Sequence, residues 1–265
     1  MTGRVLSKST RDLLVRLADR YETAAFLEGD PSWFMHQVSG AANMEATAFV
    51  ASALSFGSRS QFLPKIGWLL ERAGGDMDRW IREGAFERDV PPDPSRCFYR
   101  FFTLESMNRF LRMYRDLMDE HGTLGAFVRE SAGGDALRAV EAICGRFSSG
   151  GGCPAVPASA KSACKRVCMF LRWMVRSGSP VDLGLWADSV DRGTLVIPLD
   201  THVLQESERL GLVKSSCASM CAARRLTAVL AEAFPGDPCR GDYALFGYGV
   251  DAERERVEKG KGERE

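Results

Sequence analysis

Histidine is scarce in this chain, and its cysteines are not spaced like common metal ligands. Three histidines occur among 265 residues, and none of the eight cysteines belongs to a C-x-x-C pair. Zinc sites usually combine such pairs with further cysteine or histidine ligands. Cys164/Cys168 and Cys217/Cys221 are spaced four apart, which suits small residues of a helical core. An iron–sulfur cluster at Cys217, Cys221 and Cys239 is the alternative, but this spacing matches no standard ligand run. We expect no metal and no cofactor.

Net charge, long apolar runs and a signal-peptide core are also missing. The 35 Lys and Arg residues balance the 35 Asp and Glu residues, so any nucleic-acid site must be a local patch. No apolar run approaches the about 18 residues that a membrane span needs. The N-terminal sequence MTGRVLSKSTRDLL passes directly into an amphipathic helix. We therefore expect a cytoplasmic, monomeric protein with reduced cysteines and no membrane partner.

Patterns typical of strands are rare, and there is no βαβ alternation. Apolar residues instead recur at helical spacing along most of the chain. Met44 to Phe56 is nearly apolar all round, which predicts a buried core helix. The sequence predicts an all-α fold. We expect a single unit over residues 1–250, with two helical lobes over roughly 30–140 and 1–29 plus 141–250, and a polar tail over residues 251–265.

The segment KSACKRVCMFLRWMVR predicts a helix of about four turns with two unlike sides. On a helical wheel, Lys161, Lys165, Arg172 and Arg176 fall within about 80° of one another, while apolar residues cover the opposite side. A row of cations is destabilised by self-repulsion unless something anionic lies opposite it. Asp200 is one candidate for that role, and a phosphate backbone is another.

A second distinctive segment is the apolar run LVIPLDTH that leads to Asp200. Pro198 holds Ile197 in an extended conformation, and Asp200 then has the character of a helix N-cap. An N-cap aspartate alone has a purely structural explanation. Its combination with the preceding Pro198 and the following His202 is more specific, and we count His202 among the residues that contact nucleic acid.

A lysine and an aspartate that share a cleft can cleave a nucleoside. The amine attacks the anomeric carbon, and the carboxylate stabilises the sugar cation while the base leaves. Neighbouring cations favour the neutral amine and bind the adjacent phosphates. We expect Arg166, Arg172 and Arg176 to be these cations. An extruded base also needs an apolar or aromatic pocket, for which the candidates are Trp173, Trp186 and Phe246.

Two further segments have both a functional and a structural interpretation. Arg59 and Gln61 lie at a predicted helix start, where they can hydrogen-bond a phosphate or a base edge; the alternative is an N-cap followed by a solvated turn. The aromatic segment 98–102, FYRFF, is either a surface on which bases stack or part of the core with a flanking charge.

These motifs resemble known families. IPLDTHV followed by RLGL resembles the V-D-T-H segment of the helix–hairpin–helix DNA glycosylases of the endonuclease III type, and Met44 to Ser60 resembles their early core helix. The larger set KRVCMFLRWMVR, VDLGLW, IPLDTHV, RLGL and DYALFGYG closely resembles an uncharacterised bacterial family. That family is catalogued as a domain of unknown function, number twenty-four hundred, and the resemblance covers roughly residues 5–250.

The glycosylase resemblance implies a catalytic Asp200 and excision of a damaged base from double-stranded DNA. Aligning Lys161-Ser162-Ala163 with the glycosylase Lys-Thr-Ala selects Lys161 as the nucleophile, whereas the Lys-Arg pair of the uncharacterised family selects Lys165, which we favour. The lysine–aspartate separation is similar to that of the archaeal 8-oxoguanine glycosylases. The L-P-G-V-G hairpin is replaced by CPAVPA, and the terminal four-cysteine cluster is missing.

Three functions are compatible with the sequence. The first is a base-excision glycosylase, with or without lyase activity through Lys165. The second is a nucleic-acid-binding protein that has kept the same fold without the chemistry. The third is an interaction module whose basic helix docks on an acidic protein partner.

Overall fold

The computed structural model describes residues 6–149, 152–215 and 217–262, and these residues are mainly helical. The predicted all-α class is confirmed at this level. Short 3-10 helices are η1 (Ala24–Leu27), η2 (Pro31–His36), η4 (Arg192–Thr194) and η5 (Pro238–Arg240). The α-helices are α1 (Lys8–Tyr21), α2 (Ala41–Leu54), α3 (Arg59–Arg72), α4 (Met77–Arg82), α5 (Phe86–Asp89), α6 (Leu104–His121), α7 (Leu124–Ala132), α8 (Ala136–Ser148), α9 (Lys165–Val175), α10 (Thr201–Arg209), α11 (Met220–Ala233) and α12 (Gly241–Gly262).

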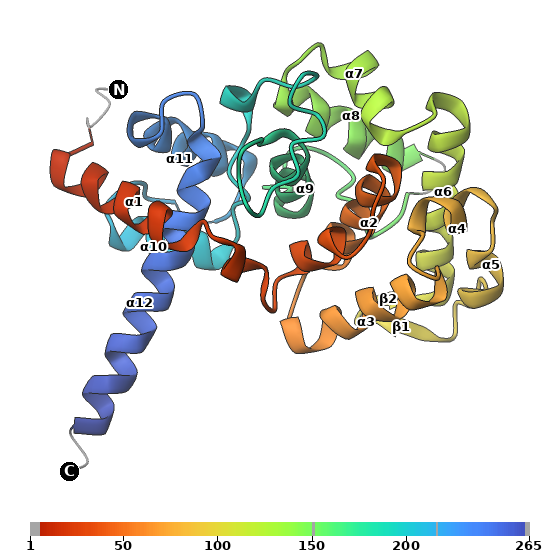
Figure 1. The fold of residues 1–265 in the computed structure, drawn as a ribbon, viewed down its shortest axis with the longest axis horizontal. Helices are drawn as coiled ribbons and strands as arrows, with labels where there is room; N and C mark the ends of the chain where they lie inside the picture. Colours follow the sequence, from red (N-terminus) through yellow and green to blue (C-terminus); the bar gives the residue numbers. More distant parts are fainter. Residues whose placement is uncertain (1–5, 150–151, 216, 263–265) are drawn as a thin grey trace.

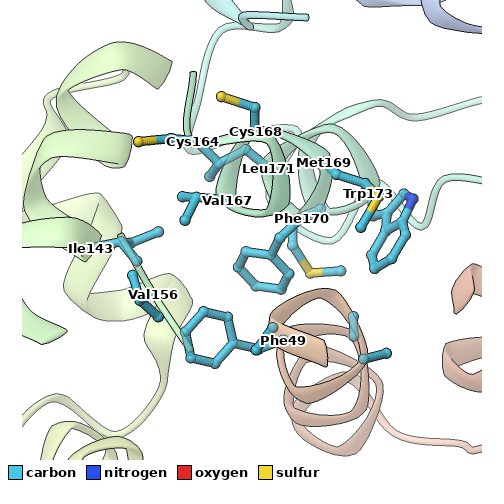
Figure 2. Close-up of a cluster of buried hydrophobic side chains, with 14 of the residues drawn as sticks. Phe49, Ile143, Val156, Cys164, Val167, Cys168, Met169, Phe170, Leu171 and Trp173 are labelled. Atoms are coloured by element: carbon cyan, nitrogen blue, oxygen red, sulfur yellow. The ribbon is translucent and has the colours of Figure 1, made fainter. Parts of the chain in front are cut away.

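Helices α2 and α9 lie between two groups of helices (Figure 1). On one side are α1, α10, α11 and α12, and on the other are α3 to α8. The buried apolar residues of both groups form one continuous core. Phe49 of α2 and Phe170 of α9 meet at its centre, with their ring centroids 5.1 Å apart, and Figure 2 shows both rings between the two helices.

Helix α2 is the buried core helix that its apolar sequence predicts. Every residue from Glu45 to Leu54 is buried. The one carboxylate among them, that of Glu45, accepts hydrogen bonds from the backbone N–H groups of Leu124 and Gly125 and from Trp186 Nε1, at 2.8, 3.1 and 3.0 Å. Burial raises the pKa of Glu45, although these three donors oppose the shift. The carboxylate thereby joins α2 to the first turn of α7.

A small hairpin departs from the helical pattern. Strands β1 (Cys97–Tyr99) and β2 (Phe102–Thr103) pair in antiparallel fashion. Arg100 turns the chain between them in a left-handed conformation, with φ of 52°. Phe98, Tyr99 and Phe102 are buried, whereas Phe101 is 61% exposed. The core interpretation of the FYRFF segment therefore holds for most of its rings, and the exposed ring of Phe101 leaves the base-stacking interpretation a prediction.

Helix α9 begins later than the sequence predicts. It starts at Lys165 and not at Lys161, because Cys164 adopts a left-handed conformation with φ of 46° and ψ of 36°. Residues 152–164 form no helix. Lys161 is therefore not on the helical face that the wheel assigned to it, and the expected row of four stacked cations is wrong.

At the C-terminal end, α12 continues through residues that the sequence analysis treated as a polar tail. The helix extends from Gly241 to Gly262 and projects away from the other helices in Figure 1. Residues 263–265 lie outside the described part of the chain. Within that part, no helix is both long enough and apolar enough to cross a membrane.

Candidate functional site

Two adjoining hollows open beside the first turn of α9. The first has a volume of about 510 Å³ and is lined by the segment after α2, the start of α3 and residues 162–166. The second, of about 390 Å³, lies between α9, the start of α10 and α12. The residues that line both hollows are Asp30, Arg59, Lys165, Met169 and Asp200.

Lys165 and Asp200 face each other where the two hollows meet. Lys165 Nζ lies 4.0 Å from Asp200 Oδ2, and their side chains are 32% and 43% exposed. Asp200 caps α10 as its sequence predicts: its Oδ1 accepts a hydrogen bond of 2.9 Å from the backbone N–H of Val203. The cap uses Oδ1 and leaves Oδ2 directed toward the amine. The chain therefore presents an accessible amine and a fixed carboxylate together.

Lys161, the alternative nucleophile, lies elsewhere. It is exposed and lines neither hollow. Its backbone carbonyl accepts a hydrogen bond from Met220 N, and the adjacent Ser162 forms a bridge with Ser219. The geometry thus separates the two lysines and favours Lys165.

Two carboxylates at the site were not selected from the sequence. Asp30 is 8% exposed and accepts both the backbone N–H and the hydroxyl of Ser32 on Oδ1, while its Oδ2 lies 3.5 Å from Arg59 Nη2. Asp242 lines the second hollow, and burial raises its pKa. Asp30 lies in the turn Gly29-Asp30-Pro31 that leads into η2. Neither carboxylate has a sequence signal beyond its residue type.

Arg172 and Arg176 do not form an open cationic surface, and this expectation is wrong. Both side chains are only 3% exposed. Asp182 pairs with both guanidinium groups, and further partners surround them: Asp242 bonds Arg172, while Asp237 and Glu22 bond Arg176. Burial disfavours both guanidinium charges, but the surrounding groups outweigh it and raise both pKa values. Carboxylates of the protein therefore pair with both cations, although Arg172 is also one of the residues that line the second hollow.

The other basic candidates differ in position. Arg166 lines the first hollow, donates to the carbonyls of Ala53 and Pro154, and lies 5.0 Å above the ring of Phe56. Burial lowers its pKa to about 10, so it remains charged at neutral pH. Arg59 lines both hollows. Gln61 is exposed and lines neither hollow.

His202 is the only one of the three histidines that lies at this site. It lines the second hollow, and its Nδ1 is 4.0 Å from Glu206 Oε1. Its side chain is 59% exposed. Gly249 lies close to it, because a Cβ at that position would stand 2.7 Å from His202 Nε2. The imidazole is therefore placed between the start of α10 and α12 on an accessible edge of the site.

Of the three aromatic residues proposed for a base pocket, only Phe246 lies at a hollow. It lines the second one, where its ring centroid is 4.8 Å from that of Phe26. Trp186 is buried and donates its Nε1–H to Glu45. Trp173 is wholly buried, and its Nε1 has no hydrogen-bond partner among the described residues. The assignment of Trp173 and Trp186 to a base pocket is wrong, because both indoles are part of the core.

The side chains at the two hollows determine which chemistry the site can offer. Among the described residues, no group of three or more His, Cys, Asp or Glu side chains is arranged to hold a metal ion. The residues that line the two hollows offer an amine, three carboxylates and guanidinium groups, together with the imidazole of His202 and the thiol of Cys164.

Comparison with known proteins assigns the chain to a family. No curated protein and no solved structure matches it. One family model matches residues 30–251, which include Lys165, Asp200 and every residue that lines the two hollows except Phe26. The match spans most of the 265 residues, and the chain therefore belongs to the family described as "Protein of unknown function (DUF2400)".

Proposed function

We propose that this protein removes a base from damaged DNA by cleaving the bond between the base and its sugar. Lys165 is the nucleophile and Asp200 is the carboxylate that stabilises the developing sugar cation. The observation that carries the proposal is the 4.0 Å approach of Lys165 Nζ to Asp200 Oδ2 in a solvent-reachable hollow. Placing an amine and a carboxylate together supplies both groups that such a displacement needs.

In the proposed reaction, the lysine nitrogen attacks the anomeric carbon and the carbon–nitrogen bond to the base breaks. The base takes the bonding electrons and a proton as it leaves. The amine nitrogen gives up two protons, one to the departing base and one to the ring oxygen, and the bond between the anomeric carbon and the ring oxygen breaks, which opens the sugar and leaves an imine between Lys165 and the sugar. Asp200 Oδ2 is 4.0 Å from the attacking amine, which supports a role in stabilising the positive charge on the sugar, and its other oxygen is held by the cap of α10.

The surroundings of the pair are suited to a nucleotide. Arg59 and Arg166 supply positive charge at the first hollow, and Phe246 and Phe26 supply aromatic surface in the second. Charged groups of this type bind phosphates, and aromatic rings stack on bases. A base-excision enzyme needs a space for the extruded nucleotide, and the two adjoining hollows of about 510 and 390 Å³ are the candidates for that space.

We also propose a helix–hairpin–helix glycosylase-like architecture, in which the two hollows form a cleft between two helical lobes. Its support is the position of α9 between two groups of helices (Figure 1) and the placement of Lys165 at the first turn of that helix. Residues 152–164, which join α8 to α9, would take the place of the phosphate-binding hairpin.

Borohydride trapping tests the chemistry. Reduction of the imine would link the protein covalently to DNA that contains a damaged base. We expect trapping with the unaltered protein, no trapping with Lys165→Ala, and full trapping with the matched control Lys161→Ala, because Lys161 lies outside the hollows. DNA binding should survive in both variants. Equal trapping by Lys165→Ala, or no trapping and no base release across a broad panel of lesions, would exclude this mechanism.

A non-catalytic nucleic-acid-binding protein is the second candidate. It is favoured by one observation: the exposed ring of Phe101 lies outside both hollows, so a base can stack there without reaching Lys165. In that case, Asp200→Asn would leave every measurable function intact.

A further inference from the structure

Two thiols lie directly behind the candidate nucleophile. Cys144 Sγ of α8 is 3.8 Å from the Sγ of Cys164, the residue that precedes Lys165. Both cysteines are free and buried. In Figure 2 the side chain of Cys164 points toward the helix that carries Ile143, which is α8. The two sulfurs come from segments that are 20 residues apart, so a bond between them would join two separate elements of the fold.

The geometry makes the two thiols unequal. The hydrogen bond with Cys144 lowers the pKa of Cys164, and Ser162 and the positive charge of Arg166 act in the same direction. The same hydrogen bond, together with burial, raises the pKa of Cys144. Cys164 also lies at the N-terminal end of α9, an 11-residue helix whose dipole favours a negative charge there. Cys164 is thus the more acidic thiol of the pair.

Cys164 is only 3% exposed, but it is one of the residues that line the first hollow, together with Ser162, Lys165 and Arg166. The hollow offers a small oxidant a route to this residue. Reactive cysteines are usually of this kind: a thiolate in an electropositive environment with a second thiol close by.

We infer that Cys164 and Cys144 form an oxidation site, in which a hydroperoxide converts Cys164 to a sulfenic acid and Cys144 then closes a disulfide with it. In the first step the Cys164 thiolate attacks one peroxide oxygen, the O–O bond breaks and hydroxide leaves. In the second step Cys144 loses its proton and attacks the Cys164 sulfur, the S–O bond breaks and water leaves. Two thiols lose two electrons in total, and hydrogen peroxide is reduced to two molecules of water.

The disulfide would change the position of Lys165. A disulfide holds its sulfurs about 2.05 Å apart, whereas the thiols lie 3.8 Å apart, so at least one of the two side chains must move, and we infer that the backbone at Cys164 shifts with it. Cys164 already occupies a left-handed conformation that non-glycine residues rarely adopt, with φ of 46°. Lys165 is the next residue and would move with it relative to Asp200. This consequence rests on the proposed function, whereas formation of the bond does not.

Peptide mass spectrometry tests the oxidation directly. Trypsin releases Cys144 in AVEAICGR and Cys164 in SACK, separately from Cys153 and Cys168. After brief treatment of the full-length protein with hydrogen peroxide, we expect the linked pair of these two peptides to form roughly tenfold faster than any oxidised product of the exposed Cys97. Cys144→Ser should abolish the link and leave a sulfenic acid on Cys164 that dimedone labels. Cys164→Ser should abolish both products, and the matched control Cys97→Ser should change neither.

Two results would overturn the inference. One is oxidation of Cys97, Cys217 or Cys221 while AVEAICGR and SACK remain reduced. The other is Cys144→Ser protein in which dimedone does not label Cys164. The readout is independent of any activity on DNA, so a chain that forms the linked peptide but traps no DNA would support the oxidation site and contradict only the proposed function.

Discussion

The two carboxylate oxygens of Asp200 have different contacts: one caps a helix and the other faces Lys165. Oδ1 accepts the backbone N–H of Val203 and begins α10, while Oδ2 lies 4.0 Å from Lys165 Nζ. Asn is also a good N-cap, but it has no charge. We therefore expect Asp200→Asn to abolish trapping and base release with little change in stability. Asp200→Ala should abolish the same activity and also lower the free energy of unfolding by about 1 kcal/mol, through loss of the cap.

The trapping assay measures the loss of activity in the two variants, and their unfolding in urea measures the loss of stability. Thr201→Ala is a suitable control, because Thr201 is exposed and directly follows the cap. If Asp200→Asn keeps full activity, the carboxylate has no part in the chemistry and only its structural role remains.

The choice between Lys161 and Lys165 shows what the sequence can decide at this scale. The pattern PLDTH contained enough local information to predict the N-cap at Asp200. The start of α9 was not predictable in the same way, because it depends on the left-handed conformation of Cys164, a residue type with no preference for that region. A helical wheel assumes that the helix extends over the whole segment. It therefore placed Lys161 on the same face as Lys165, although Lys161 lies before the start of α9.

At the scale of elements, the β1–β2 hairpin gives a separate test of nucleic-acid binding. Phe101 is 61% exposed and lies beside Phe56, with their ring centroids 4.9 Å apart; Arg100 lies 5.8 Å from the same Phe56 ring. An exposed ring next to a guanidinium is a stacking surface for a base, and removal of such a ring costs about 1–3 kcal/mol of binding. We expect Phe101→Ala to weaken binding to single-stranded DNA by roughly tenfold or more.

Fluorescence anisotropy at fixed salt measures this change, and Leu185→Ala, at another exposed apolar residue, is the control. Because Phe101 contributes little to the core, its loss should leave the unfolding midpoint nearly unchanged. Unaltered DNA binding by Phe101→Ala would show that the exposed ring of the hairpin does not contact nucleic acid.

The burial of α9 explains why its charges were assigned to the wrong partner. Its own sequence shows only that Arg172 and Arg176 lie on one side. The carboxylates that neutralise them come from residues 22, 182, 237 and 242, which the fold brings together from the ends of α1 and α12 and from two connecting segments. Helical spacing predicts which residues share a face. It does not predict whether that face meets solvent, a ligand or distant parts of the same chain.

At the scale of the whole molecule, the ion pairs of Arg172 and Arg176 connect the N-terminal and C-terminal helices to α9. Asp182 is fully buried; its Oδ1 lies 3.2 Å from Arg172 Nε, and its Oδ2 accepts from Arg176 and, at 2.9 Å, from the hydroxyl of Tyr243 on α12. Arg176 continues the network to Glu22, which directly follows α1. One carboxylate therefore connects α9 with α12, and through Arg176 with α1.

Asp182→Asn tests how far stability depends on this network. The substitution keeps the size of the side chain but leaves two buried guanidinium groups with one fewer negative charge, and breaking a buried ion pair costs about 3–5 kcal/mol. Since domains of this size unfold with about 5–15 kcal/mol, such a loss is a large fraction of the total. Equilibrium unfolding in urea measures this loss of stability.

The matched control is Glu105→Ala, which removes a half-exposed carboxylate 4.0 Å from Arg109 and should cost less than about 1 kcal/mol. If both variants unfold at the same urea concentration, solvent compensates the buried charges and the ends of the chain are held by apolar packing alone.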